Sequence, residues 1–176
     1  DSVENKFGFM TFDDALAVEK AVDGEKRVLI IGAGLIGLKC AEGILGRAKS
    51  VTVCDLADRV LSSILDAESA AIMQSHLEKC GVRFMLGDTA ASFDKNTAHM
   101  KSGRDVEFDV LILAVGVRAN SALVKDAGGD AGRGIVIDGR CAASLPDVYA
   151  AGDCTESRDA SDGKIKVMAL MPNAYM

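Results

Sequence analysis

Strand-length apolar runs alternate with stretches of helical periodicity along most of the chain. Residues 27–31, 51–54 and 110–114 are nearly continuous aliphatic runs, the pattern of strands that are buried on both faces of a sheet. Between residues 66 and 80 the apolar positions recur at helical spacing, and Gly81 supplies a stop. The resulting β–α–β–α–β order predicts an α/β fold with a parallel sheet and right-handed crossovers.

Shorter signals complete this pattern. Thr11 stands three residues before Asp14, a capping-box spacing that predicts the start of a helix. Between residues 90 and 108, short alternating segments with a turn at Gly103 predict a small antiparallel meander. The other expected elements are helices through Val22, from the glycine loop to Leu45 and over 120–127, and strands over 82–86, 135–137 and 148–150.

Composition narrows the class of protein. The 176 residues suffice for one good-sized core, and 18 glycines with only 5% aromatic residues suit a compact α/β domain. The formal net charge of −6 argues against a nucleic-acid or anionic-membrane surface, which needs a basic excess. No segment reads as a signal peptide or a membrane span, so we expect a soluble cytoplasmic protein.

Cysteine and histidine give no sign of a metal or nucleophilic centre. The five cysteines include no Cys-x-x-Cys pair, so we expect most of them to be small buried side chains in a reducing compartment. His76 and His99 have no neighbouring cysteine or acid in a ligand or triad arrangement. We therefore assign no metal ligand and no catalytic side chain.

The segment Gly32-Ala33-Gly34-Leu35-Ile36-Gly37 is a Gly-x-Gly-x-x-Gly fingerprint between a predicted buried strand and a predicted helix. Gly32 allows a tight turn, Gly34 allows a pyrophosphate to approach the backbone, and Gly37 allows helix and strand to pack closely. The helix N-terminus offers N–H groups to the phosphates. An ordinary glycine-rich βα turn is the structural alternative.

Asp55 closes the second strand, about 20 residues beyond the fingerprint, where a carboxylate binds the adenine ribose of a dinucleotide. A carboxylate there repels a 2′-phosphate, and the sequence therefore favours NADH over NADPH. A solvated acid at a strand end is the alternative interpretation. Arg59 would weaken the preference if its side chain turned toward the ribose.

Three ordered motifs resemble the pyridine nucleotide-disulfide oxidoreductase family. The segment Asp147–Cys154 is similar to that family's late FAD-binding motif, and Val28–Gly37 with Asp55–Arg59 fits its NAD-binding motif. Leu111–Asn120 also fits, although the family usually has proline where this chain has Ala119. Gly134–Asp138 and Ala169–Ala174 agree less specifically.

The resemblance implies a fragment of an FAD-dependent enzyme in which hydride passes from NADH to FAD and then to a disulfide, dioxygen or a redox protein. It implies a connecting segment over 1–24, an NAD(H)-binding Rossmann-like domain over 25–141, and part of an FAD-binding domain over 142–176. The other FAD-binding and dimerisation segments of the family are missing, so we expect an inactive fragment of a homodimeric enzyme.

By this resemblance Val115 and Gly116 lie close to NAD, while Gly152 and Asp153 contact FAD, with Asp153 accepting a hydrogen bond. A local turn cap is the alternative role for Asp153. Two positions depart from the family. Leu35 stands where many members have tyrosine, and Lys39 replaces a glutamate near the nicotinamide, either as an exposed helix lysine or as a different contact.

The competing function is a stand-alone NAD-binding module that senses redox state without catalysis. The segment Val148–Cys154 argues against it, because a sensor has no use for a flavin-contacting motif. A short-chain dehydrogenase needs a Tyr-x-x-x-Lys pair, which Tyr149 and Tyr175 do not supply. A methyltransferase leaves the flavin-type segments unexplained. The sequence does not identify the electron acceptor.

Overall fold

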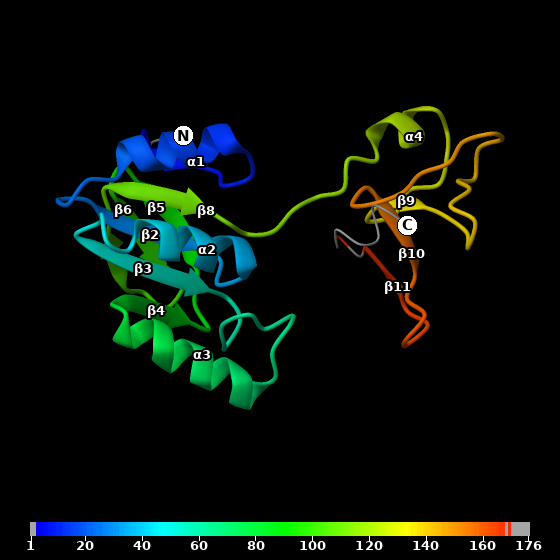
Figure 1. Cartoon of the computed structure of the whole chain (residues 1–176). Helices are drawn as coiled ribbons and strands as arrows, with labels where there is room; N and C mark the ends of the chain where they lie inside the picture. The colour runs from blue at the N-terminus through cyan, green and yellow to red at the C-terminus, as the bar shows by residue number, and fades with distance from the viewer. Residues whose placement is uncertain (1–2, 168, 170–176) are drawn as a thin grey trace. The chain divides into compact units, whose positions relative to one another are not determined.

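The computed structural model describes residues 3–167 and residue 169. The chain forms two compact units, Asp1–Gly116 and Val117–Met176, which are described separately (Figure 1). The division at Gly116 comes earlier in the chain than the expected boundary after residue 141. The reason is that β9 (Ile135–Val136) pairs with β10 (Thr155–Arg158), which ties the residues before 141 into the second unit.

A five-stranded sheet forms the centre of the first unit. Its strand order is β1-β8-β2-β3-β4, and all neighbouring strands are parallel. The chain runs from β2 outward to β3 and β4 and then returns to place β8 on the other side of β2. The topological switch point therefore lies between β2 and β8. The strands are β1 (Lys6–Phe7), β2 (Arg27–Ile31), β3 (Ser50–Asp55), β4 (Val82–Leu86) and β8 (Val110–Leu113).

The sheet is covered on both faces, which explains its continuous aliphatic strands. On one face, Ile30 and Ile112 are fully buried in a cluster that includes α2 residues such as Leu38. On the other face, Leu111 packs with Phe108 and residues of the antiparallel meander. Full burial of each large aliphatic side chain stabilises the fold by about 1.5–3 kcal/mol. The helices are α1 (Phe12–Ala21), α2 (Leu35–Ile44) and α3 (Ala67–Lys79), and the meander is β5 (Ala90–Asp94), β6 (Thr97–Met100) and β7 (Asp105–Glu107).

Local signals set the helix ends. Thr11 and Asp14 form the expected capping box at the start of α1. Asp66 accepts a hydrogen bond from the Ser69 N–H at the start of α3, and Gly81, with a φ of +107°, follows the end of α3. In contrast, α2 begins at a glycine and has no side-chain cap. This exposed helix end lies at the carboxyl edge of the sheet.

The second unit contains α4 (Ala122–Asp126) and the three-stranded sheet β11-β10-β9, with β11 at Ile165–Lys166. The expected strand over 148–150 is wrong, because only Tyr149 makes an isolated bridge there, to Ala142. The left-handed backbone of Asp147 (φ +60°) and Gly152 (φ +82°) bounds this short extended stretch. The motif Ala169–Ala174 lies outside the described residues except for Ala169.

The expected α/β class is confirmed, with a Rossmann-like parallel sheet, a small antiparallel meander and a small mixed sheet. Within the described residues, no helix is both long and apolar enough to cross a membrane.

Candidate functional site

Gly32 turns the chain sharply between β2 and α2. Its φ is +114°, and a Cβ there would lie 2.2 Å from the carbonyl oxygen of Ala114. The Gly32 N–H donates a hydrogen bond to the carbonyl of Cys54 at 2.7 Å. Gly32 is thus enclosed between the ends of β3 and β8, and a side chain at this position would separate the loop from the sheet.

The other two fingerprint glycines have different surroundings. A Cβ on Gly37 would lie 2.0 Å from the Gly32 carbonyl oxygen, so this glycine permits the close packing of α2 on the turn. A Cβ on Gly34 would meet nothing within 4 Å. Gly34 therefore faces open space, and the backbone there is accessible to a ligand.

The first turn of α2 is suited to an anion. Gly34 is its N-cap and makes no side-chain capping bond, and the first turn contains no acidic residue. The first N–H bonded within the helix is that of Leu38, which donates to the Gly34 carbonyl at 3.0 Å. The preceding N–H groups and the helix dipole together favour negative charge at this end.

Asp55 connects the end of β3 to the glycine loop. One carboxylate oxygen accepts a hydrogen bond from the Ala33 N–H at 2.6 Å, and the other accepts one from the Ala57 N–H at 2.8 Å. The side chain is half-buried. Each oxygen retains a lone pair for a ribose hydroxyl. Asp55 therefore orients the loop while it presents a carboxylate at the edge of the sheet.

A second clamp on the loop was not foreseen from the sequence. The N–H of Leu61 donates to the Ala33 carbonyl at 2.9 Å, and Leu61 is buried with a left-handed φ of +50°. Such a backbone is unfavourable for leucine and persists only where the surroundings enforce it. Both peptide groups of Ala33 are thus fixed. No local pattern signals this contact, because it joins two segments that are distant in sequence.

The loop after β8 completes the same edge of the sheet. Val115 is 71% exposed and Leu35 is 60% exposed, whereas Gly116 has a φ of +101°. The structure therefore brings the expected residues of the first unit to one edge: Gly32, Ala33, Gly34, Leu35, Ile36, Gly37, Asp55, Val115 and Gly116.

Two cationic side chains near this edge have partners of their own. Arg59 contacts the Asp58 carboxylate at 3.0 Å and lies near the carbonyls of Ser62 and Leu65. The Arg59 contacts are therefore all with its own loop. Lys39 forms an ion pair with Glu42, with 2.7 Å between the Lys39 Nζ and a carboxylate oxygen.

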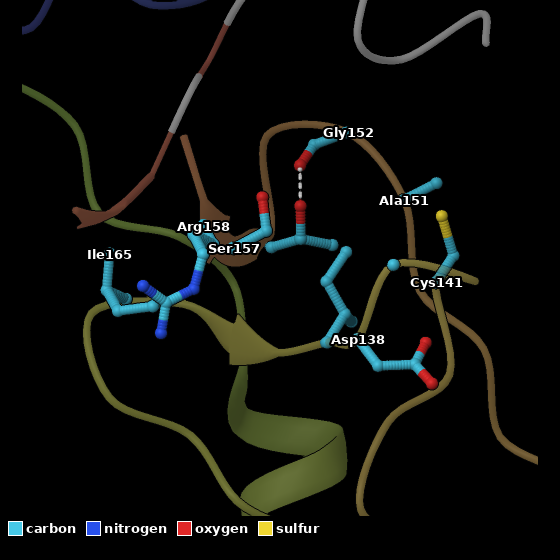
Figure 2. A pocket seen from close by; sticks show the side chains of 10 residues that line it. Asp138, Cys141, Ala151, Gly152, Ser157, Arg158 and Ile165 are labelled. Carbon is cyan, nitrogen blue, oxygen red and sulfur yellow. Dashed lines mark hydrogen bonds between the residues drawn. The ribbon is translucent and has the colours of Figure 1, made fainter. Parts of the chain in front are cut away.

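Gly152 and Asp153 lie in the second unit, in a turn before β10. The Thr155 N–H and hydroxyl both donate to the Gly152 carbonyl, at 3.0 and 2.7 Å. Figure 2 shows this contact at the wall of a cavity of about 690 Å³, which is also lined by Asp138, Cys141 and Arg158. Asp153 is exposed within the turn. Its carboxylate is accessible to a hydroxyl-bearing ligand.

The five cysteines are all free thiols, and only Cys40 and Cys54 are buried as expected. Burial raises the pKa of each of these two thiols to about 11, so they are protonated at neutral pH. Cys80 and Cys141 are exposed, Cys154 is partly exposed, and the Cys80 sulfur lies 3.8 Å from the His76 Nε2, a neighbour that the sequence did not predict. Within the part of the chain that the structure describes, no cluster of histidine, cysteine and acidic residues suits a metal ion.

The site consists of a glycine turn at the switch point of a parallel sheet, an uncapped end of α2 and a clamped carboxylate, in an α/β protein with a Rossmann-like sheet. A match to the family described as pyridine nucleotide-disulphide oxidoreductase extends over residues 2–176. The chain belongs to this family.

Two curated relatives illustrate the match. The chain is 35% identical over 168 residues to the NADH oxidase of Methanocaldococcus jannaschii, covering 92% of this chain and 38% of the relative. It is 35% identical over 144 residues to the nitric oxide reductase FlRd-NAD(+) reductase of Enterobacter sp. (strain 638), covering 80% of this chain and 38% of the relative. The chain thus spans well under half the length of these relatives.

Two solved structures show the same architecture. The water-forming NADH oxidase from Lactobacillus brevis bound to NADH matches with a TM-score of 0.87 at 27% identity, over 97% of this chain and 39% of that one. An engineered water-forming NADPH oxidase, a mutant of that enzyme bound to NADPH, matches with a TM-score of 0.86 at 27% identity and the same coverage.

Proposed function

We propose that the first unit binds NADH and that the chain is part of an FAD-dependent oxidoreductase. When both cofactors are bound, they supply the chemistry, in which hydride passes from NADH to FAD and electrons then go to an acceptor. One observation carries the proposal: the open backbone at Gly34 and the Asp55 carboxylate lie together at the switch point of a parallel sheet.

The residues of the first unit have distinct tasks in this proposal. Gly34 and the first N–H groups of α2 hold the pyrophosphate, for which the space beside Gly34 is open. Asp55 accepts hydrogen bonds from the adenine ribose hydroxyls. Val115 and Leu35 offer exposed apolar surface for the ring at the other end of the dinucleotide.

The preference for NADH rests on the charge of Asp55. Its carboxylate is held at the edge of the sheet by two backbone N–H bonds, and a carboxylate in that place repels a 2′-phosphate. Arg59, the cation that would offset this repulsion, contacts Asp58 and lies near two carbonyl groups of its own loop.

The engineered NADPH oxidase supports this assignment by its substitutions. There an aspartate is replaced by alanine, the next residue by arginine, and a preceding glycine by alanine. That glycine and aspartate have the same sequence separation as Gly37 and Asp55. These changes remove a carboxylate and add a cation beside it, which is the charge change that favours binding of a 2′-phosphate.

FAD is assigned to the second unit, where Gly152 and Asp153 would hold part of it. The left-handed Gly152 leaves the turn without a side chain beside the cavity, and the exposed Asp153 carboxylate suits a ribityl hydroxyl. We propose that other segments of the intact enzyme supply the remaining contacts, and that the intact enzyme is a homodimer.

The acceptor is assigned only by class. The curated relatives include an NADH oxidase and a nitric oxide reductase FlRd-NAD(+) reductase, and the family description names a disulphide oxidoreductase. We therefore propose dioxygen, a redox protein or a disulfide.

The test is a titration of the chain with NADH, monitored by NADH fluorescence. We expect saturable enhancement for the wild type, displacement of NADH by ADP-ribose, and loss of the signal for Asp55→Ala. A linear response for the wild type would exclude the proposed site.

A further inference from the structure

The only charged residues of α2 are Lys39 and Glu42, and they bind each other. The Lys39 Nζ lies 2.7 Å from a Glu42 carboxylate oxygen, one turn further along the helix. The two side chains are 74% and 66% exposed. The Lys39 ammonium lowers the pKa of the Glu42 carboxyl. An exposed pair at this spacing is weak and exchanges readily with other partners.

Lys39 lies on the exposed face of α2, on the same side as Leu35, which follows the glycine loop. Leu35 and Lys39 are four residues apart, both are exposed, and they share one face of α2. The opposite face, which includes Leu38 and Ala41, is buried. Side chains on a helix lean toward its N-terminus, so a lysine released at position 39 extends over Leu35 toward the first turn.

The charge of the ligand favours that exchange. The pyrophosphate of a dinucleotide carries two negative charges, and the helix dipole supplies only about half an opposite charge. Lys39 is the only cation on α2, whereas Glu42 carries a single exposed negative charge. A doubly charged pyrophosphate is therefore the stronger partner for the lysine.

We propose that Lys39 is a pyrophosphate-binding residue, held by Glu42 in the free protein and transferred to the dinucleotide when it binds. This proposal rests on the proposed function of the first unit. Glu42 competes for the lysine and thereby lowers the affinity for the dinucleotide.

Charge-removing variants of the two residues have opposite expected effects. We expect Lys39→Gln to raise the Kd for NADH about two- to fivefold and Glu42→Gln to lower it by a similar factor. The gain from Glu42→Gln should largely disappear in the double variant, since it acts through Lys39. The control is Lys79→Gln, because Lys79 is exposed at the last turn of α3, at the opposite edge of the sheet, and should leave Kd unchanged.

Two further measurements identify the group that is contacted. ADP-ribose contains the pyrophosphate but lacks the nicotinamide, and Lys39→Gln should weaken its binding as much as that of NADH. Added salt should weaken NADH binding more steeply for the wild type than for Lys39→Gln.

The outcomes separate this inference from the proposed function. If the wild type binds NADH but neither variant changes Kd, Lys39 is only a surface residue and the inference is wrong. If Lys39→Gln weakens NADH binding but not ADP-ribose binding, the lysine contacts the nicotinamide end and the pyrophosphate assignment is wrong. If the wild type binds neither ligand, the proposed function itself fails.

Discussion

At the scale of single residues, glycines of one motif serve different needs. Gly32 is required by the fold, because its backbone is left-handed and a Cβ would overlap the Ala114 carbonyl. The fold does not require a glycine at position 34, where the backbone is not left-handed and a Cβ would meet no atom within 4 Å, and we propose that pyrophosphate binding does. The motif predicted the tight turn at Gly32, but not that Asp55 also fixes the loop through Ala33. That contact depends on how two strand ends meet, which no local pattern encodes.

Replacing each of these two glycines by alanine separates folding from binding. Gly32→Ala should lower the free energy of unfolding by at least about 2 kcal/mol, through backbone strain and overlap. Gly34→Ala should cost less than about 1 kcal/mol, as at an ordinary N-cap, yet raise the Kd for NADH on the order of tenfold. Urea unfolding and NADH titration measure the two effects. Equal losses of stability would contradict the assignment.

Asp55→Asn tests the clamp on the loop. Both carboxylate oxygens accept N–H bonds, and asparagine keeps only one acceptor oxygen, so either Ala33 or Ala57 loses its partner. We expect a loss of about 1–3 kcal/mol in the free energy of unfolding and at least a tenfold rise in the Kd for NADH. Asp58→Asn is the control, since the Asp58 side chain is 81% exposed. Unchanged stability in Asp55→Asn would show that the clamp is unimportant.

At the scale of secondary-structure elements, the order of strands creates the site. Because β8 returns beside β2, the loop after β8 diverges from the glycine turn, which is the loop after β2. The long apolar strands and amphipathic helices were predictable from periodicity. The short strands β1, β10 and β11 were not, because pairing with a neighbour creates them: β10, for example, reads Thr-Glu-Ser-Arg and has no apolar alternation.

The amino ends of β2 and β8 are joined by an ion pair whose effect depends on pH. Arg27 bonds Asp109 through its side chain and its backbone N–H, and this lowers the pKa of the Asp109 carboxyl to about 2. Because the folded-state pKa lies below the unfolded value near 4, the stabilisation is complete above about pH 4 and is lost as the pH falls toward 2.

Asp109→Asn should therefore lower the free energy of unfolding by about 1–2 kcal/mol at pH 7, a value that allows for partial exposure of the pair. The difference from the wild type should shrink between pH 4 and pH 2. Denaturant unfolding over this pH range measures it, with Asp94→Asn, at an exposed position of β5, as the control. A difference that does not change with pH would contradict the role of the ion pair.

At the scale of the whole molecule, the first unit contains every residue that we assign to NADH. The division at Gly116 leaves the glycine loop, Asp55 and Val115 in one compact unit, and Gly152 and Asp153 in the other. Both sets come from local motifs in the sequence, and their roles stay predictions. The compact units divide the chain earlier than the domain boundary expected after residue 141, because β9 pairs with β10.

Calorimetric titration of the chain with NADH and, in parallel, NADPH tests the central claim most directly. We expect saturable binding of NADH and at least tenfold weaker binding of NADPH, because the fixed Asp55 carboxylate repels the 2′-phosphate. Equal or tighter binding of NADPH would contradict the role of Asp55, and binding of neither would contradict the assignment of the site.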